Sequence, residues 1–114
     1  MEEELHKKKC VPCKGNIPPF DMKEIHKYLK KINGWEVKNK NNSYFLEKNY
    51  KFKNFKISQL FVNEVGKIAE VESHHPDIHF GWGYAKVIIF THAIEGLAES
   101  DFILASKIDQ IKIN

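Results

Sequence analysis

Histidines gather in one part of this sequence, and they are the side chains best suited to move protons near neutral pH. Four of the six, His74, His75, His79 and His92, lie within 19 residues. The pair His74-His75 precedes Pro76, which stops a helix and favours an extended backbone before it. We expect both rings in a loop where a helix ends, as general acid/base groups or as caps favoured by the helix dipole. The pattern leaves both readings open.

A carboxylate is expected to face the core near these histidines. In a helix expected over residues 95–111, Asp101 lies in the middle of the apolar stripe, which consists of Leu97, Leu104, Ala105, Ile108 and Ile111. Burying an unpaired charge is costly, so Asp101 needs a partner, and in a chain without Arg a histidine is the obvious candidate. Alternatively, a local kink lets Asp101 reach water, or it accepts hydrogen bonds from backbone amides.

Metal binding is the competing interpretation. Three histidines and a carboxylate could ligate zinc or iron, but adjacent histidines rarely point at one ion, and no HExxH spacing is present. Cys10-Val-Pro-Cys13 has the CxxC spacing of redox pairs and half zinc sites. Two cysteines cannot complete a tetrahedral site, so we interpret them as incidental or structural thiols. We therefore expect no bound metal.

The elements that must position these residues follow from hydrophobic periodicity. Helical spacing after a cap at Asp21 predicts a first helix that stops at Asn33-Gly34. Alternating runs predict a hairpin over 35–52 and two strands over 78–90. Helical spacing predicts a helix over 54–73 and a last helix over 95–111. This order indicates an α+β fold, a four-stranded antiparallel sheet with three helices packed on one face. We divide the chain into an N-terminal arm with the CxxC pair (residues 1–18) and a single domain (residues 19–114).

Composition narrows the function classes. The 114 residues suit one compact core, and no run approaches the ~20 apolar residues that cross a bilayer, so we expect a cytoplasmic protein without membrane contact. All 18 basic residues are Lys, and the lack of Arg argues against direct nucleic acid readout. Residues 1–56 hold 14 Lys against 7 acids, which we interpret as a solvated surface rather than an anion-binding site.

The spacing of these residues resembles a known family. The run Glu70-x-x-x-His74-His75-Pro76, continued by Trp82, His92 and Asp101, is similar to the signature of the pterin-4a-carbinolamine dehydratases. Further similarities lie in Phe52-Lys53-Asn54-Phe55, Thr91-His92, Gly96-Leu97, and the leading CxxC followed by Gly34-Trp35, as in bacterial members. The resemblance covers residues 10–110.

The resemblance implies the same fold and a cofactor-free enzyme that dehydrates 4a-hydroxytetrahydropterin, the pterin left by an aromatic amino acid hydroxylase. It implies catalytic roles for three residues, His74, His75 and His92, with His74 the proton-transfer group at the 4a-hydroxyl. It implies substrate-binding or orienting roles for Glu70, Asp101 and Trp82, whose ring we expect at the site wall. It further implies a homodimer or homotetramer. His79 lies outside the motif.

A different class of function remains as an alternative, a non-catalytic dimerisation or transcriptional coactivator module. Some family members also act as dimerisation cofactors for a homeodomain transcription factor. In this sequence the alternative depends on Phe102 and Ile103, two apolar residues outside the stripe of the last helix. We expect them to form a homo-oligomer interface rather than a partner surface.

Overall fold

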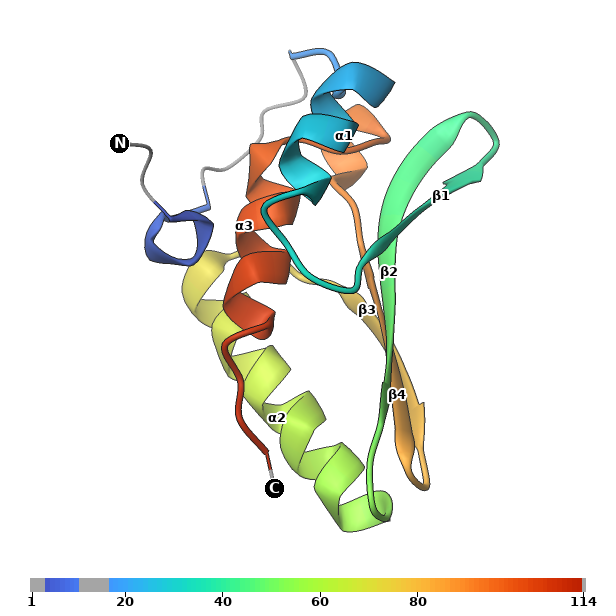
Figure 1. The fold of residues 1–114 in the computed structure, drawn as a ribbon, viewed down its shortest axis with the longest axis vertical. Coiled ribbons are helices and arrows are strands. Elements are labelled where there is room, and N and C mark those ends of the chain that lie inside the picture. The colour runs from blue at the N-terminus through green and yellow to red at the C-terminus, as the bar shows by residue number, and fades with distance from the viewer. Residues whose placement is uncertain (1–3, 11–16, 114) are drawn as a thin grey trace.

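The computed structural model describes residues 4–10 and 17–113 of the chain. Within them a four-stranded antiparallel sheet has its helices on one face, so the predicted α+β architecture is confirmed (Figure 1). In chain order the elements are η1 (Leu5–Lys7), α1 (Met22–Leu29), β1 (Glu36–Lys40), β2 (Ser43–Lys51), α2 (Phe55–Glu72), β3 (Asp77–Gly81), β4 (Tyr84–Ile89), η2 (His92–Ile94) and α3 (Glu99–Ile108). No helix in these two ranges is long and apolar enough to cross a membrane.

The sheet has the strand order β1-β2-β4-β3, with every neighbouring pair antiparallel. The turn between β1 and β2 falls on Asn41 and Asn42, whose φ angles of 54° and 66° are tolerated by Asn better than by most residues. Alternate residues of β4, namely Ala85, Val87 and Ile89, face the helices and are buried, and Leu46 of β2, opposite Ile89, is buried with them. Strand alternation thus places one face of the sheet in the core.

Helix α2 begins and ends where the sequence predicts. Asn54 caps it by accepting a hydrogen bond from the Ile57 amide at 3.0 Å. It ends at Ser73, which adopts a left-handed conformation with φ 53°, and the His74 amide then donates to the Ala69 carbonyl. This left-handed residue turns the chain sharply, so that the His74 side chain meets the start of α3.

Helix α3 is shorter than predicted, because Glu99–Ile108 replaces the expected span 95–111. Glu95 has φ 49°, a left-handed conformation that a helix interior excludes. A β-bridge between Thr91 and Gly96 also closes a short loop around η2 before the helix begins. Apolar periodicity extends into this loop although its backbone is not helical.

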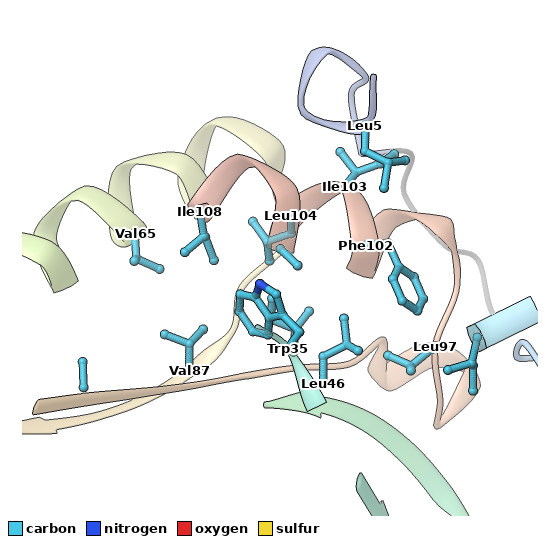
Figure 2. Packing of buried hydrophobic residues seen from close by; sticks show 14 of the residues in the cluster. Leu5, Trp35, Leu46, Val65, Val87, Leu97, Phe102, Ile103, Leu104 and Ile108 are labelled. Atoms are coloured by element: carbon cyan, nitrogen blue, oxygen red, sulfur yellow. The ribbon is translucent and has the colours of Figure 1, made fainter. Parts of the chain in front are cut away.

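The expected exposure of Phe102 and Ile103 is wrong. Both are buried in the core of this chain, at 0% and 2% exposure, because α3 is covered on its other side by α1 and the N-terminal residues. Phe102 stacks on Phe20 and lies beside Tyr28, while Figure 2 shows Ile103 against Leu5. Neither side chain is available to another protein, so the interface predicted on them is overturned.

The described part of the N-terminal region packs against the helices. Leu5 is only 5% exposed and belongs to the hydrophobic core, and Cys10 is half-buried. Residues 4–10 of the predicted arm therefore pack on the domain. Cys13 lies outside the described residues, so of the CxxC pair only the position of Cys10 is described.

Candidate active site

The centre of the site is a hydrogen-bonded pair between His74 and Asp101. Nε2 of His74 lies 2.7 Å from Oδ1 of Asp101, although the two residues are 27 positions apart in sequence. The Asp101 side chain is 0% exposed and that of His74 is 16% exposed. The left-handed end of α2 presents the ring, and the first turn of α3 presents the carboxylate.

The second carboxylate oxygen of Asp101 accepts two further hydrogen bonds. Oδ2 accepts a hydrogen bond from the Thr91 hydroxyl at 2.7 Å and another from the Ala98 amide at 2.8 Å. The amide belongs to the residue that precedes α3, so Asp101 also satisfies one of the open N–H groups at the start of that helix. The buried acid therefore has a histidine partner and a backbone amide partner at once, two alternatives that the sequence did not separate.

His75 points away from this pair and toward solvent. Its Nε2 is hydrogen-bonded to Oε2 of Glu70, one turn earlier on α2. Both side chains are largely exposed, at 59% and 77%, and ion pairs of this kind contribute little to stability in water. Glu70 thus contacts a site histidine without lying in the site itself.

His92 approaches from the other side, at the start of η2. Its ring lies 4.3 Å from that of Phe90, measured between centroids, at a tilt of 48°. It is exposed, and within residues 4–10 and 17–113 no hydrogen bond or ion pair to its ring is found. Packing on Phe90 therefore holds the imidazole, and both ring nitrogens remain available to a ligand.

These three histidines line one pocket of about 420 Å³, a size suited to a small heterocyclic ligand. Its walls are Cys10, Glu72, Ser73, His74, His75, Pro76, Asp77, Phe90, Thr91, His92 and Ser100. Asp101 lies behind His74 rather than in the wall. The chain thus brings together His74, His75 and His92 with two orienting carboxylates.

Trp82 is not brought to this pocket. It lies in the turn between β3 and β4, 71% exposed. The pocket begins at Asp77, the other end of β3, and four residue steps along a strand amount to ~13 Å. The wall position expected for the Trp82 ring is therefore not found within one copy of the chain. His79, on the outer side of β3, also lies outside the pocket.

Sequence reasoning missed Cys10 and Glu72 as wall residues. Burial, together with the neighbouring Glu72 carboxylate, raises the pKa of the Cys10 thiol to about 12, so it stays protonated near neutral pH. Burial alone would raise the pKa of Glu72, but hydrogen bonds from the Cys10 amide and from Lys107 hold it below its usual range. No sequence signal marked Cys10 for this pocket beyond its CxxC spacing.

No metal centre is found in the part of the chain that the structure describes. There, no three His, Cys, Asp or Glu side chains come close enough together to hold an ion. Instead, His74 and His75 are each hydrogen-bonded to a carboxylate. The arrangement can deliver and remove protons at a small molecule bound between two loops.

Comparisons with known proteins identify the family of this chain. The sequence profile of the pterin 4 alpha carbinolamine dehydratase family matches residues 18–111. A relative from Rubrobacter xylanophilus, provisionally named pterin-4-alpha-carbinolamine dehydratase, is 46% identical over 108 residues, covering 95% of this chain and 98% of the relative. A relative with the same provisional name from Rickettsia bellii is 49% identical over 109 residues, covering 95% and 94%.

Solved structures share the fold. A transcriptional coactivator/pterin dehydratase from Brucella melitensis superposes with a TM-score of 0.72 at 24% identity, covering 80% of this chain and 95% of that one. A pterin dehydratase-like protein, described as a RuBisCO assembly factor of the alpha-carboxysome, superposes with a TM-score of 0.58 at 20% identity, covering 68% and 87%. With its profile match and its near full-length relatives, this chain belongs to the pterin-4a-carbinolamine dehydratase family, a family of hydro-lyases.

Proposed function

We propose that this protein removes water from a 4a-hydroxytetrahydropterin by histidine general acid/base catalysis. One observation carries the proposal, the placement of three imidazoles around a single pocket with one of them fixed by a buried carboxylate. The reaction breaks the bond between C4a and its hydroxyl oxygen and forms a double bond from C4a to the adjacent ring nitrogen. One proton goes to the leaving oxygen, which departs as water, and one leaves that nitrogen, giving the quinonoid dihydropterin.

His74 is the proton-transfer group at the 4a-hydroxyl. Because Oδ2 of Asp101 already accepts two hydrogen bonds, the remaining bond is best made by Nε2–H of His74 donating to Oδ1. This hydrogen bond fixes the tautomer and leaves Nδ1 to exchange a proton with the substrate. The carboxylate also stabilises the imidazolium that forms when Nδ1 is protonated. Asp101 is therefore an orienting residue for His74.

His92 and His75 complete the acid/base set. His92 has both nitrogens available, so it serves as the partner that takes or gives the second proton. His75, hydrogen-bonded to Glu70, contacts the substrate from the outer rim of the pocket, and Glu70 holds its tautomer. A positioned proton-transfer group of this kind contributes ~10²–10⁴-fold to the rate.

The rate of carbinolamine dehydration by the purified protein tests this proposal. The wild-type protein should speed the reaction far above its spontaneous rate, and His74→Ala and His92→Ala should each lower kcat by ~10²-fold or more in a protein that still folds. His92→Ala should leave Tm nearly unchanged, whereas His74→Ala should also lower Tm because it removes the partner of the buried Asp101. His79→Ala is the matched control, because His79 is a neighbouring histidine outside the pocket. Full activity in both pocket variants would refute the assigned roles, and no acceleration by the wild-type protein would refute the reaction.

The family also supports a place for this reaction in metabolism. We propose that the substrate comes from an aromatic amino acid hydroxylase, whose used pterin is returned for reduction, and that the enzyme acts without a cofactor as a homodimer or homotetramer. Sedimentation of the purified protein tests the oligomer. Faster turnover of a hydroxylase on adding this protein tests the supply of substrate.

A non-catalytic interaction module is the second candidate. It is supported by the description of two proteins with this fold, one as a transcriptional coactivator and the other as a RuBisCO assembly factor. The sequence feature that favoured this module was the pair Phe102 and Ile103 outside the apolar stripe, and both side chains are buried in the core. The module predicts a stoichiometric partner whose binding survives His74→Ala, whereas the dehydratase predicts activity from the purified chain alone.

A further inference from the structure

The first part of the chain forms a wall of the proposed active site. We define the N-terminal segment as Leu5–Cys10, which lies before the region matched by the family profile. Leu5 is buried against α3, where it packs beside Ile103 (Figure 2). Lys8 Nζ then forms an ion pair with Oε2 of Glu99 at 3.0 Å, in the first turn of α3. The segment is thus attached to the helix that supplies Asp101.

Its last residue bridges the two helices of the site. The Cys10 amide donates to Oε1 of Glu72 at 2.8 Å, at the end of α2, and the thiol donates to the Ser100 carbonyl at 3.4 Å, in α3. His74 follows Glu72 by two residues, and Asp101 follows Ser100 directly. Cys10 therefore lies across the same two helix ends whose side chains form the central histidine–carboxylate pair.

The surroundings of Glu72 stabilise its hydrogen bond with the Cys10 amide. Its side chain is only 7% exposed, and Oε2 lies 3.3 Å from Nζ of Lys107, itself 18% exposed. A carboxylate so far from water requires its partners, because an unpaired buried charge is costly. Lys107 balances the charge and the Cys10 amide takes the second oxygen. The segment is thereby held by a buried, charge-balanced contact rather than by surface packing.

We propose that the N-terminal segment is a substrate-binding wall, in which the Cys10 thiol contacts the bound pterin and Glu72 is the residue that positions it. The inference rests on the proposed function for the identity of the ligand. The pocket wall that contains the three histidines also contains Cys10 and Glu72, so a ligand that fills it reaches the segment. A protonated thiol is a small, polarizable surface, suited to packing against a flat heteroaromatic ring and unsuited to nucleophilic attack.

Protection of the thiol from alkylation tests the contact without requiring turnover. In a Cys13→Ser chain Cys10 is the sole thiol. Because only the thiolate reacts, its slow alkylation by excess iodoacetamide is followed by mass spectrometry at about pH 9, where a small part of the thiol is ionised, with and without 7,8-dihydrobiopterin. At a pterin concentration about ten times its Kd, measured by calorimetry, the rate should fall about tenfold, because only the free protein reacts. The matched control carries Lys9→Cys in a Cys10→Ser, Cys13→Ser chain, since Lys9 is exposed and should not be protected.

The outcomes separate this inference from the proposed function. Pterin binding with an unchanged rate at Cys10, or with equal protection at position 9, overturns the wall and leaves the dehydratase intact. Pterin that does not bind overturns both. Protection of Cys10 in a protein that binds pterin yet does not speed dehydration supports the wall and refutes the catalytic proposal.

Glu72 supplies a second test, with a readout that a purely structural role would not move. Glu72→Ala removes the acceptor of the Cys10 amide and should raise KM severalfold while kcat stays within about twofold, because the histidines remain in place. Glu72→Gln keeps an oxygen for that amide and should restore KM to near the wild-type value. Equal KM in the two variants, or an equal loss of kcat in both, would overturn the positioning role.

Discussion

Replacing Asp101 with Asn should invert the hydrogen bonding of His74 while leaving the fold nearly intact. The Asn oxygen can occupy the place of Oδ2 and still accept from the Thr91 hydroxyl and the Ala98 amide. Its amino group then faces Nε2 of His74, which must accept rather than donate. The ring proton moves to Nδ1, the nitrogen that the mechanism requires as the exchange site.

The size of the effect follows from the contact that is lost. A hydrogen bond to a charged group contributes ~1.5–3 kcal/mol, and about 2 kcal/mol of lost imidazolium stabilisation corresponds to a kcat lowered by about 30-fold. The Asn oxygen keeps both donors of Oδ2, but the second N–H of the new amide has no acceptor, because His74 is the partner of Oδ1; the free energy of unfolding should fall by ~1–2 kcal/mol. In a domain of this size that lowers Tm by ~4–8 °C. Activity and stability should therefore separate.

Two measurements check this prediction, stopped-flow dehydration of the carbinolamine and the ¹⁵N NMR shifts of the His74 ring. Asp109→Asn is the matched control on the same helix, since Asp109 binds Lys48 Nζ at 2.9 Å and Trp35 Nε1 at 3.0 Å, away from the pocket. The control should lose stability and keep kcat. An Asp101→Asn protein with an inverted tautomer and full kcat would refute the role given to this pair.

Three further predictions concern packing, pH and Trp82. Phe102→Ala should lower the free energy of unfolding by ~3–5 kcal/mol in chemical denaturation, because the ring is fully buried. A loss under ~1 kcal/mol would show that the ring is not part of the core and would favour the interface role. Glu72 has a lowered pKa, so its stabilisation is present above pH 4.5 and is lost as pH falls through the folded-state pKa. Acid denaturation of Glu72→Gln should therefore be less steep than that of the wild type below pH 4.5, and identical slopes would contradict the assigned charge. Trp82→Ala should change the free energy of unfolding by less than ~0.5 kcal/mol and leave KM unchanged, whereas a raised KM would place this ring in a site shared between copies of the chain.

The parts of the fold that depend on local signals could be predicted from the sequence. Asn54 is a strong cap, the apolar period of the following helix is regular, and Pro76 limits how far that helix can run. The position of His74 at an element boundary follows from these features. The pairing of His74 with Asp101 could only be posed as one of several options, because it joins residues from different elements.

The limits of helix α3 depend on contacts that periodicity does not encode. Leu97 fits the helical stripe, yet Glu95 is left-handed and the Thr91–Gly96 bridge shapes the backbone before the helix. The prediction of a single apolar stripe also assumes that only one face of this helix is buried. Because this helix lies between the sheet, α1 and the N-terminal residues, Phe102 on the opposite side is buried as well.

The wall formed by Cys10 is the part of the site that sequence reasoning could least foresee. Its contacts with Glu72 and Ser100 span 62 and 90 positions of the chain. A charged N-terminal region gives no periodic signal, and the burial of Leu5 and the packing of Cys10 against the core involve residues that are far away in the sequence.

The most direct test of the central claim is a structure of this protein with a reduced pterin bound. We expect the ring in the pocket between His74 and His92, with its 4a carbon placed so that the hydroxyl oxygen lies within ~3 Å of a His74 nitrogen. A pterin bound at another surface, or in this pocket with its 4a position turned away from all three imidazoles, would contradict the proposed dehydratase mechanism.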